Sequence, residues 1–406
     1  MASAASLPLL AATGPVALLQ SRRADAHPIT PEERGQRLAR ARELMGQQKL
    51  SAICLTGGSS LQYFSGIHWG HSERLFALVL PRAGAAFCVS PAFEEERVRE
   101  QLTQMPGGPA ARIYTWQEDD DPYALTARGL RDAGVATGRI GMEERVPYVF
   151  SSGIAQASPG LEIASATPVT AGCRARKSQA ELALMQLANN VTLQAYEAAW
   201  KQIHIGMTTG ELSALIGVAY DRLGFPGEAS VQTGAYSALP HGSVQPQKIR
   251  EGAIVMIDDG CTVEGYQSDI TRTFVLGKPS AKMRQVFDVV HQAQSAALAA
   301  ARPGEPCEAV DRAARSVVTA AGYGPDYQHF THRVGHGIGL EGHEWPYLVR
   351  GNRQLLQPGM TFSDEPGVYI RGEFGVRLED DMYITENGAR LFTGPSHSLE
   401  EPFRQG

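Results

Sequence analysis

The chain has 406 residues, which is enough for two domains, and its 43% hydrophobic and 20% charged residues are typical of a globular protein. A formal net charge of −6 argues against nucleic acid as the main partner, because phosphate binding requires a basic face. The five cysteines are scattered without a Cys-x-x-Cys pair, which argues against a zinc finger or a dense disulfide framework.

The first 26 residues differ from the rest of the chain. A run of small and apolar residues from Ser6 to Leu19 precedes Ala24-Asp25-Ala26, which resembles a signal-peptidase site. The run is too short to span a bilayer, and no other segment could do so. The basic residues expected before such a run are missing, so a disordered tail is the alternative. We interpret residues 1–26 as an export signal, which predicts a periplasmic or secreted protein without a membrane segment in its mature form; otherwise the protein would be cytoplasmic.

Residues 27–172 are predicted to form an α/β domain. It begins at Thr30-Pro31-Glu32-Glu33, a capping box with proline at the first helical position. Strand-like and helical stretches then alternate, which predicts a largely parallel sheet. The strand-like runs are Ala52–Leu55, Phe76–Leu80, Ala86–Val89, Arg112–Tyr114 and Arg139–Met142, and the helical ones surround Phe93–Leu102 and Tyr123–Ala133.

This first domain shows no cluster of catalytic residues. His68 and His71 lie three positions apart around Trp69-Gly70 and could bind a metal ion. Because no carboxylate lies close to them in the sequence, a position in a loop or an interface fits them better.

A domain boundary is expected near Thr167–Lys177, where basic residues cluster without helical periodicity, and residues 173–406 are expected to form the second domain. Two capping boxes, a serine cap and an initial proline predict four of its helices. These helices start at about Ser178, Thr208, Ser280 and Pro306.

The stretch from Ala253 to Phe274 predicts two β-strands joined by a short turn at Glu264-Gly265. The first strand is apolar yet ends in Asp258 and Asp259, and Asp269 is expected within the second strand. An unpaired buried carboxylate costs on the order of several kcal/mol, so these residues require a neutralising partner. A metal ion is the simplest one.

Three later segments carry isolated polar residues on an apolar background. They are Gly-His-Gly-Ile-Gly around His336, Asp-Glu-Pro-Gly around Glu365, and Arg-Leu-Glu-Asp-Asp around Glu379. Together with Asp258 and Asp269 they provide four carboxylates and one imidazole, whose charge balances two divalent cations about 3.5–4 Å apart. This oxygen-rich set favours Mn²⁺, with Co²⁺, Fe²⁺ or Zn²⁺ as alternatives, and calcium fits less well because it rarely takes imidazole.

Three further histidines and one arginine could act beside these ligands, namely His241, His332, His343 and Arg377. Arg377 precedes Glu379 by two residues, so in a strand both side chains face the same side. The guanidinium could pair with a ligand carboxylate or hold a substrate carboxylate. An ordinary hydrogen-bonded histidine is the alternative for each of the three imidazoles.

The order and spacing of these motifs resemble the metallopeptidases of the pita-bread fold, in the branch of aminopeptidase P and prolidase, over about residues 30–400. The resemblance implies an α/β N-terminal domain like that of creatinase, followed by an α+β pita-bread catalytic domain with two pseudo-symmetric halves. Methionine aminopeptidase fits less well, because it has histidine where this chain has Asp380. Creatinase has lost the metal ligands that this chain keeps.

The resemblance also implies how the metal ligands divide. Asp258 would hold one metal ion, and His336 with Glu365 would hold the other. Asp269 and Glu379 would bridge both ions.

Roles for the remaining residues follow from the same resemblance. Glu365 would handle the proton of the attacking water, and His241 would shuttle protons or steady the intermediate. His343 would contact the substrate amide or carbonyl, while His332 and Arg377 would line the proline side of the pocket.

The expected activity is therefore that of an Xaa-Pro aminopeptidase, which hydrolyses the Xaa-Pro bond at the amino end of a peptide. An Xaa-Pro dipeptidase (prolidase) is the alternative, because Arg377 and His332 occur in both kinds of enzyme. A non-catalytic or non-peptidase protein on the same fold is a remoter one. Proline-containing peptides are the expected substrates, and the resemblance suggests a homodimer or homotetramer.

Overall fold

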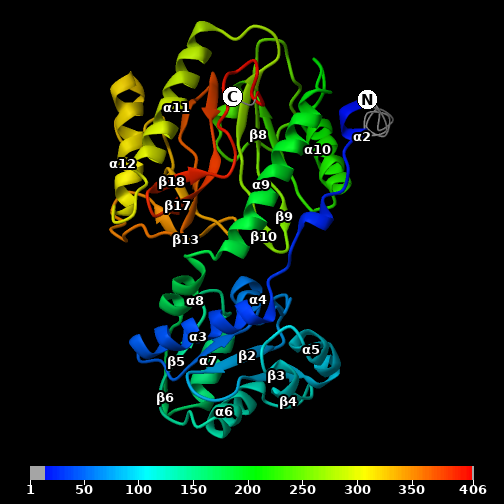
Figure 1. The fold of residues 1–406 in the computed structure, drawn as a ribbon, viewed down its shortest axis with the longest axis vertical. Helices are drawn as coiled ribbons and strands as arrows, with labels where there is room; N and C mark the ends of the chain where they lie inside the picture. The colour runs from blue at the N-terminus through cyan, green and yellow to red at the C-terminus, as the bar shows by residue number, and fades with distance from the viewer. Residues whose placement is uncertain (1–13, 405–406) are drawn as a thin grey trace. The chain divides into compact units, whose positions relative to one another are not determined.

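The computed structural model describes residues 14–404, which form two compact units (Figure 1). One unit is Ile29–Arg174, and the other contains the residues from Ala175 onward together with those up to Pro28. The division falls inside the basic stretch Thr167–Lys177. Part of that stretch forms helix α8 (Thr167–Arg174), which the sequence pattern does not predict.

The unit Ile29–Arg174 contains a six-stranded sheet in the order β4-β3-β2-β1-β5-β6. The pairs β1–β5, β5–β6 and β3–β4 are parallel, whereas β2 is antiparallel to both β1 and β3. The sheet is therefore more mixed than the largely parallel sheet that the sequence predicts. Its strands are β1 (Ala52–Leu55), β2 (Ala77–Pro81), β3 (Phe87–Pro91), β4 (Arg112–Trp116), β5 (Gly138–Met142) and β6 (Leu161–Ser165).

Helices of this unit begin where the local sequence supplies caps. The Thr30 side chain accepts a hydrogen bond from the Glu33 N–H, and Pro31 occupies the first turn of α3, so this predicted start is confirmed. Asp121 caps α6 in the same way. The helices are α3 (Pro31–Gln47), α4 (Gly58–Ser65), α5 (Glu95–Leu102), α6 (Pro122–Asp132), α7 (Tyr148–Ala157) and α8.

The His68–His71 loop holds an aromatic contact. The Trp69 ring stacks on Phe76 with 4.3 Å between ring centroids, and the Arg97 guanidinium lies 4.6 Å from the Trp69 centroid. Within residues 14–404, neither histidine belongs to a group of side chains that could hold a metal ion.

Four long helices flank the sheets of the other unit (Figure 1). Reciprocal capping boxes at Ser178 and Thr208 begin α9 and α10, and the Ser280 side chain caps α11. Pro306 is the N-cap of α12. The predicted starts of all four helices are confirmed; their bounds are α9 (Gln179–Trp200), α10 (Thr209–Leu223), α11 (Ala281–Ala300) and α12 (Cys307–Val318).

Two sheets form the centre of this unit. A three-stranded antiparallel sheet has the order β11-β8-β7, and a five-stranded sheet has the order β13-β12-β14-β17-β18. Helix α10 contacts β7, whereas α11 and α12 contact the five-stranded sheet and bury a shared apolar core against it. The strands are β7 (Ser230–Thr233), β8 (Ile254–Asp258), β11 (Arg272–Val275), β12 (Gly335–Gly337), β13 (Glu344–Leu348), β14 (Thr361–Asp364), β17 (Asp380–Thr385) and β18 (Gly388–Leu391), with a separate pair β15 (Gly367–Ile370) and β16 (Phe374–Arg377).

The predicted turn at Glu264-Gly265 is confirmed between β9 (Thr262–Val263) and β10 (Tyr266–Gln267). Both turn residues have positive φ, 51° and 89°, as the tightest antiparallel hairpins require. Asp269, in contrast, is not part of a strand. It lies between β10 and β11, where its backbone N–H donates to the Asp381 carboxylate at 3.0 Å instead of to a neighbouring strand.

The predicted export signal lies partly outside the described residues, which begin at Gly14. The described part includes α2 (Gly14–Ala17), where Val16 is fully buried. The backbone N–H of Arg22 donates to the carbonyl of Leu223 at the end of α10, at 2.8 Å. Among the described helices, none combines the length and the apolar character that crossing a membrane requires.

Candidate metal centre

The five predicted metal ligands line one cavity of about 800 Å³. They reach it from separate elements of the catalytic unit, which contains the residues from Ala175 onward. Asp258 ends β8, Asp269 follows β10, His336 lies in β12, Glu365 follows β14, and Glu379 lies between β16 and β17. The side chain of His336 is fully enclosed, whereas the carboxylates of Asp258 and Asp269 are partly exposed to the cavity.

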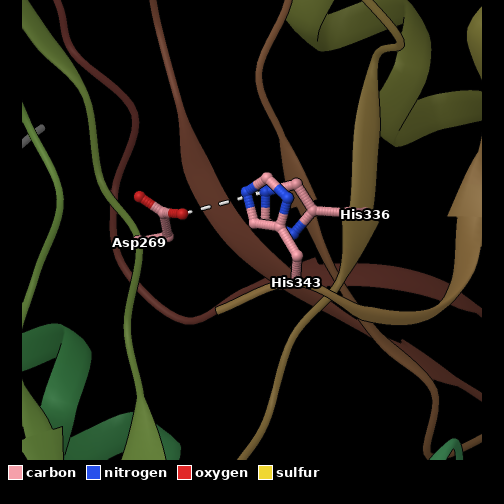
Figure 2. Close-up of side chains that lie close together, drawn as sticks. All are labelled: Asp269, His336 and His343. Atoms are coloured by element: carbon pink, nitrogen blue, oxygen red, sulfur yellow. Dashed lines mark ion pairs between the residues drawn. The ribbon is translucent and has the colours of Figure 1, made fainter. Parts of the chain in front are cut away.

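Potential ligand atoms come close together in three overlapping groups. Within each group the atoms lie within 4.8 Å of one another. His336 Nε2 lies 3.3 Å from Glu365 Oε1 and 3.8 Å from Asp269 Oδ2, and Figure 2 shows the Asp269 carboxylate turned towards the imidazole. The groups are Asp258–Asp269–Glu379, His336–Glu365–Glu379 and Asp269–His336–His343.

The protonation chemistry of this cluster suits divalent cations. Burial and the neighbouring carboxylates raise the pKa of Asp269 and Glu379 well above the ordinary range, and burial raises the pKa of Glu365 to about 8. Protons or cations must therefore offset the negative charge. Two divalent ions would do so while accepting all four carboxylates as ligands.

His336 has the tautomer that a metal ligand requires. Its Nδ1 lies 3.2 Å from the Gly337 carbonyl, which can only accept a hydrogen bond, so Nδ1 carries the proton. Burial lowers the pKa of the imidazole well below its usual value, which keeps the ring neutral. The lone pair of Nε2 then faces the carboxylates.

Thr271 connects the ligands, although the sequence motifs do not single it out. Its Oγ1 lies 2.5 Å from Asp258 Oδ1 and 2.6 Å from Glu379 Oε2, and it accepts a hydrogen bond from Arg377 Nε at 2.9 Å. The sequence could have indicated this role for Thr271 through its position two residues after Asp269, because side chains two residues apart lie on the same face of an extended chain.

The Arg377 side chain contacts several residues of the metal centre. The guanidinium forms an ion pair with Asp258, and Nη1 donates to Tyr369 Oη at 2.9 Å and to the Pro240 carbonyl at 3.0 Å. Its Nε is engaged by Thr271. Of the two roles that the sequence left open, pairing with a ligand carboxylate is the one present in this structure.

His332 belongs to a chain of hydrogen bonds. Its Nδ1 donates to the Arg333 carbonyl at 2.8 Å, so Nε2 accepts from the Tyr369 hydroxyl at 2.8 Å. That hydroxyl in turn accepts from Arg377. Burial lowers the pKa of His332 to about 3, so its ring is neutral and lies 3.7 Å from Glu365 Oε2.

His343 and His241 lie towards the solvent side of the same cavity. The His343 ring stacks on His336 with 3.7 Å between centroids (Figure 2), and its Nδ1 lies 3.1 Å from Arg333 Nη2. Because an arginine can only donate, this Nδ1 accepts and Nε2 carries the proton. His241 is exposed, in the loop after η4 (Gly234–Ala238).

The cavity has a second arginine that the motifs do not indicate. Arg333 lines the cavity, and its guanidinium lies 4.1 Å from the ring centroid of Tyr347. Within the described chain it forms no ion pair with a carboxylate, unlike Arg377. In the sequence, the one feature that could have indicated a place for Arg333 in the site is its position three residues before His336.

Asp259 also lines the cavity but is not one of the grouped ligands. Its backbone has φ 91°, and its Oδ2 accepts a hydrogen bond from the Ser230 N–H at 2.8 Å. This hydrogen bond ties the Asp259 carboxylate to the first residue of β7.

Four convergent carboxylates and a neutral histidine, in a unit of two central sheets with flanking helices, are typical of metallopeptidases of the pita-bread class. The chain belongs to metallopeptidase family M24, whose model matches residues 183–386, and residues 37–176 match the creatinase/prolidase N-terminal domain. Members of this family depend on two metal ions. The predicted fold class and the predicted class of metallo-exopeptidase are therefore confirmed.

Known relatives extend over nearly the whole chain. The probable dipeptidase PepE of Mycobacterium tuberculosis is 36% identical over 382 residues, which are 93% of this chain and 98% of the relative. The Xaa-Pro dipeptidase of Pyrococcus horikoshii is 29% identical over 88% of this chain and 96% of its own length. The crystal structure of dipeptidase PepE from Mycobacterium ulcerans superimposes with a TM-score of 0.85 at 34% identity, covering 92% of this chain and 99% of that one.

Proposed function

We propose that the protein is an Xaa-Pro dipeptidase, which hydrolyses the bond before a carboxyl-terminal proline. Relatives of full length carry the names dipeptidase and Xaa-Pro dipeptidase, which favours this alternative over the predicted aminopeptidase. The observation that carries the proposal is the second cavity arginine. Arg377 is ion-paired with Asp258, whereas Arg333 has no carboxylate partner among residues 14–404 and lines the cavity beside His343.

A dipeptide differs from a longer peptide by the free carboxylate on its proline. Arginine is suited to this group, because its planar fork can donate two parallel hydrogen bonds. The Arg333 guanidinium uses Nη2 towards His343 and stacks on Tyr347, which leaves other donors for the substrate. In an aminopeptidase the chain continues past the proline, so no counter-charge would be needed there.

Two divalent cations in the cluster, with Mn²⁺ proposed for its oxygen-rich donors, would polarise the scissile carbonyl and acidify a nucleophilic water. Glu365 Oε1 lies 3.3 Å from His336 Nε2, and Glu365 Oε2 lies 3.7 Å from His332 Nδ1. The Glu365 carboxylate is therefore placed to take a proton at the centre of the site. The prolyl nitrogen of the substrate carries no hydrogen and must receive one as it leaves. We assign this proton transfer to Glu365.

The imidazoles on the solvent side provide hydrogen-bond donors. Because His343 Nδ1 accepts from Arg333, its Nε2–H is available to donate to negative charge that develops on the scissile carbonyl oxygen. His241 is exposed at the same cavity and would contribute a second donor or exchange protons with solvent.

Comparison of three substrates tests the proposal directly. Ala-Pro, Ala-Pro amide and Ala-Pro-Ala carry the same scissile bond, but only the first has a carboxylate on its proline. A dipeptidase would hydrolyse Ala-Pro with kcat/KM at least tenfold above the other two. Equal or faster cleavage of Ala-Pro-Ala would identify an aminopeptidase instead.

Variants of Arg333 locate the carboxylate contact. Arg333→Gln should raise KM for Ala-Pro by roughly 10–100-fold, consistent with the loss of one charged hydrogen-bond pair. Cleavage of the amide should fall by less, because the amide loses only the effect of the hydrogen bond that Arg333 donates to His343. Arg350→Gln is the matched control, because Arg350 is an exposed arginine paired with Asp326 and lies outside the cavity lining.

We further propose that the protein is exported and that it assembles as a homodimer or homotetramer. Cleavage after Ala26 would remove the contact between Arg22 and Leu223, so the mature amino end should be read from the purified protein by mass spectrometry. Light scattering after gel filtration would test the proposed homodimer or homotetramer.

A further inference from the structure

Arg333, to which the proposed function assigns the substrate carboxylate, lies in an irregular segment of the chain. Residues 324–334, all of them described in the structure, belong to no helix or strand and connect η5 (Thr319–Tyr323) to β12. Side chains on loops are placed less precisely than those on helices and strands. A guanidinium that matches a carboxylate through two parallel hydrogen bonds requires a fixed position, so another element must support this segment.

An ion pair on helix α12 provides this support. Asp311 and Arg315 lie one helical turn apart and are only 1% and 6% exposed. The Asp311 carboxylate accepts a hydrogen bond from Arg315 Nε at 3.0 Å and another from Nη2 at 2.9 Å, so the pair is bidentate. Neither residue lines the metal cavity. Any effect of this pair on the substrate must therefore pass through other residues.

The other donors of Arg315 are directed at the irregular segment. Nη1 donates to the carbonyls of Asp326 at 2.9 Å and Phe330 at 2.8 Å, and Nη2 donates to the carbonyl of His332 at 2.8 Å. Together with the two hydrogen bonds to Asp311, they engage all five N–H groups of the guanidinium. Arg315 thus gives this segment the hydrogen bonds that a neighbouring strand would otherwise provide.

Two contacts of the ion pair lie directly on either side of Arg333. The His332 carbonyl, which accepts from Arg315, belongs to the peptide group before Arg333. The Val334 N–H, which donates to Asp311 Oδ1 at 3.1 Å, belongs to the peptide group after it. Because a peptide group is planar, these two hydrogen bonds fix the orientation of both planes. They also fix the direction in which the Arg333 side chain leaves the backbone.

The far end of the Arg333 side chain has uncharged partners. Its Nη2 lies 3.1 Å from His343 Nδ1, and its guanidinium lies 4.1 Å from the ring centroid of Tyr347. A carboxylate of the protein would hold this guanidinium more firmly but would also compete with the substrate for its donors. Support through the backbone avoids this competition.

We propose that Arg315, paired with Asp311, is a positioning residue that holds Arg333 where its guanidinium meets the carboxylate of the substrate proline. This inference rests on the proposed function and adds to it a residue outside the cavity on which the selectivity for dipeptides depends. A misplacement of about 1 Å can weaken such a contact by up to about 100-fold. Loss of the support should therefore reduce recognition of the carboxylate before it affects hydrolysis itself.

Arg315→Lys tests this role, because lysine keeps the positive charge beside Asp311 but replaces the planar fork of five donors by a single ammonium group. The ratio of kcat/KM for Ala-Pro to that for Ala-Pro amide should fall at least fivefold, mainly through a higher KM for Ala-Pro. Arg312→Lys is the matched control, because Arg312 is exposed on the same helix, three residues earlier. This control should leave the ratio unchanged.

A double variant separates positioning of Arg333 from general damage to the site. Arg333→Gln already lacks the guanidinium, so the addition of Arg315→Lys should change the ratio by less than twofold. A further loss as large as that in the wild-type background would overturn the proposal, because Arg315 would then act without Arg333.

Asp311→Asn perturbs the same ion pair from its other side at nearly equal side-chain size. It should also lower the ratio of Ala-Pro to Ala-Pro amide, and it carries the test if circular dichroism shows that Arg315→Lys does not fold. An unchanged ratio in the folded variants would refute the positioning role.

The same measurements distinguish failure of this inference from failure of the proposed function. Equal cleavage of Ala-Pro and Ala-Pro amide by the wild type would refute both. A wild-type preference for Ala-Pro that Arg333→Gln abolishes, but that Arg315→Lys and Asp311→Asn retain, would refute only the role of Arg315.

Discussion

Arg377 and Asp258 form an ion pair at the wall of the cavity, although they come from the separate strands β16 and β8. Asp258 is at the same time grouped with Asp269 and Glu379 as a possible metal ligand. The arginine therefore neutralises one ligand carboxylate before any cation is bound. This arrangement limits the repulsion among the buried carboxylates and holds Asp258 in place.

The first prediction concerns the removal of this arginine. Arg377→Met should lower the free energy of unfolding of the metal-free protein by roughly 3–5 kcal/mol, because it leaves a carboxylate without its partner. Saturating Mn²⁺ should restore part of this loss, since cations would replace the missing positive charge. Urea unfolding with a chelator and with Mn²⁺ measures both quantities.

The exposed pair Arg350–Asp326 provides the control for that experiment. Arg350→Met should change stability by less than about 1 kcal/mol with or without metal. If Mn²⁺ stabilised Arg377→Met no more than the wild type, Arg377 would not be acting on the charge of the cluster.

The second prediction separates the adjacent residues Asp258 and Asp259. Asp258→Asn should abolish binding of one metal ion and peptide hydrolysis, because it removes a carboxylate from the group with Asp269 and Glu379. Asp259→Asn should keep both metal ions, since the Asp259 side chain is engaged with the Ser230 N–H. Metal content after dialysis and the rate of Ala-Pro hydrolysis give the comparison; equal losses would mean that the ligand is wrongly assigned.

The third prediction concerns Thr271, whose hydroxyl lies between Asp258 and Glu379. Thr271→Val keeps the shape of the side chain but removes the hydroxyl, so metal affinity should fall by roughly 10–100-fold. Thr271→Ser retains the hydroxyl and should stay within a few-fold of the wild type. Titration of the metal-free protein with Mn²⁺ gives the affinities, and equal effects of the two substitutions would show that only packing matters there.

Local features were predictable because they depend on residues close together in the sequence. The caps at Thr30, Ser178 and Thr208 and the turn at Glu264-Gly265 formed as expected, since each requires only neighbouring side chains or a positive φ. The ligand cluster was predictable for another reason. Isolated carboxylates on apolar strands need a shared partner, which links distant segments.

Features that depend on tertiary contacts were not predictable in this way. Asp269 leaves the strand because its N–H bonds to Asp381, more than a hundred residues later. Tyr369 is positioned by the packing of β15, and Arg333 by that of the segment before β12. Neither residue lies in a distinctive sequence motif. Strand β2 likewise pairs antiparallel with both β1 and β3. The direction in which a strand pairs depends on its neighbours in the sheet and not on its own sequence.

The last prediction concerns Asp364, which precedes Glu365 and is completely buried. Neither of its carboxyl oxygens has a hydrogen-bond partner among the described residues, and burial, together with the charge of Asp380, raises its pKa well above the ordinary range. The folded protein therefore keeps this proton at neutral pH, whereas the unfolded chain releases it above about pH 4. The contribution of Asp364 to stability is largest at acid pH and falls as the pH rises towards the raised pKa.

Asp364→Val removes the titrating group and both unpaired oxygens at similar side-chain size, so the variant should be more stable than the wild type at neutral pH. Its advantage should grow from pH 5 to pH 8 by up to about 1.4 kcal/mol per pH unit, because only the wild type must hold a proton at position 364 to stay folded. Asp364→Asn is the matched comparison: it should show the same dependence on pH with a smaller gain, since its buried amide still lacks partners. Urea unfolding of the metal-free proteins at both pH values measures the differences. An advantage that does not change with pH would mean that Asp364 is ionised in the folded state and that its carboxylate has found a counter-charge.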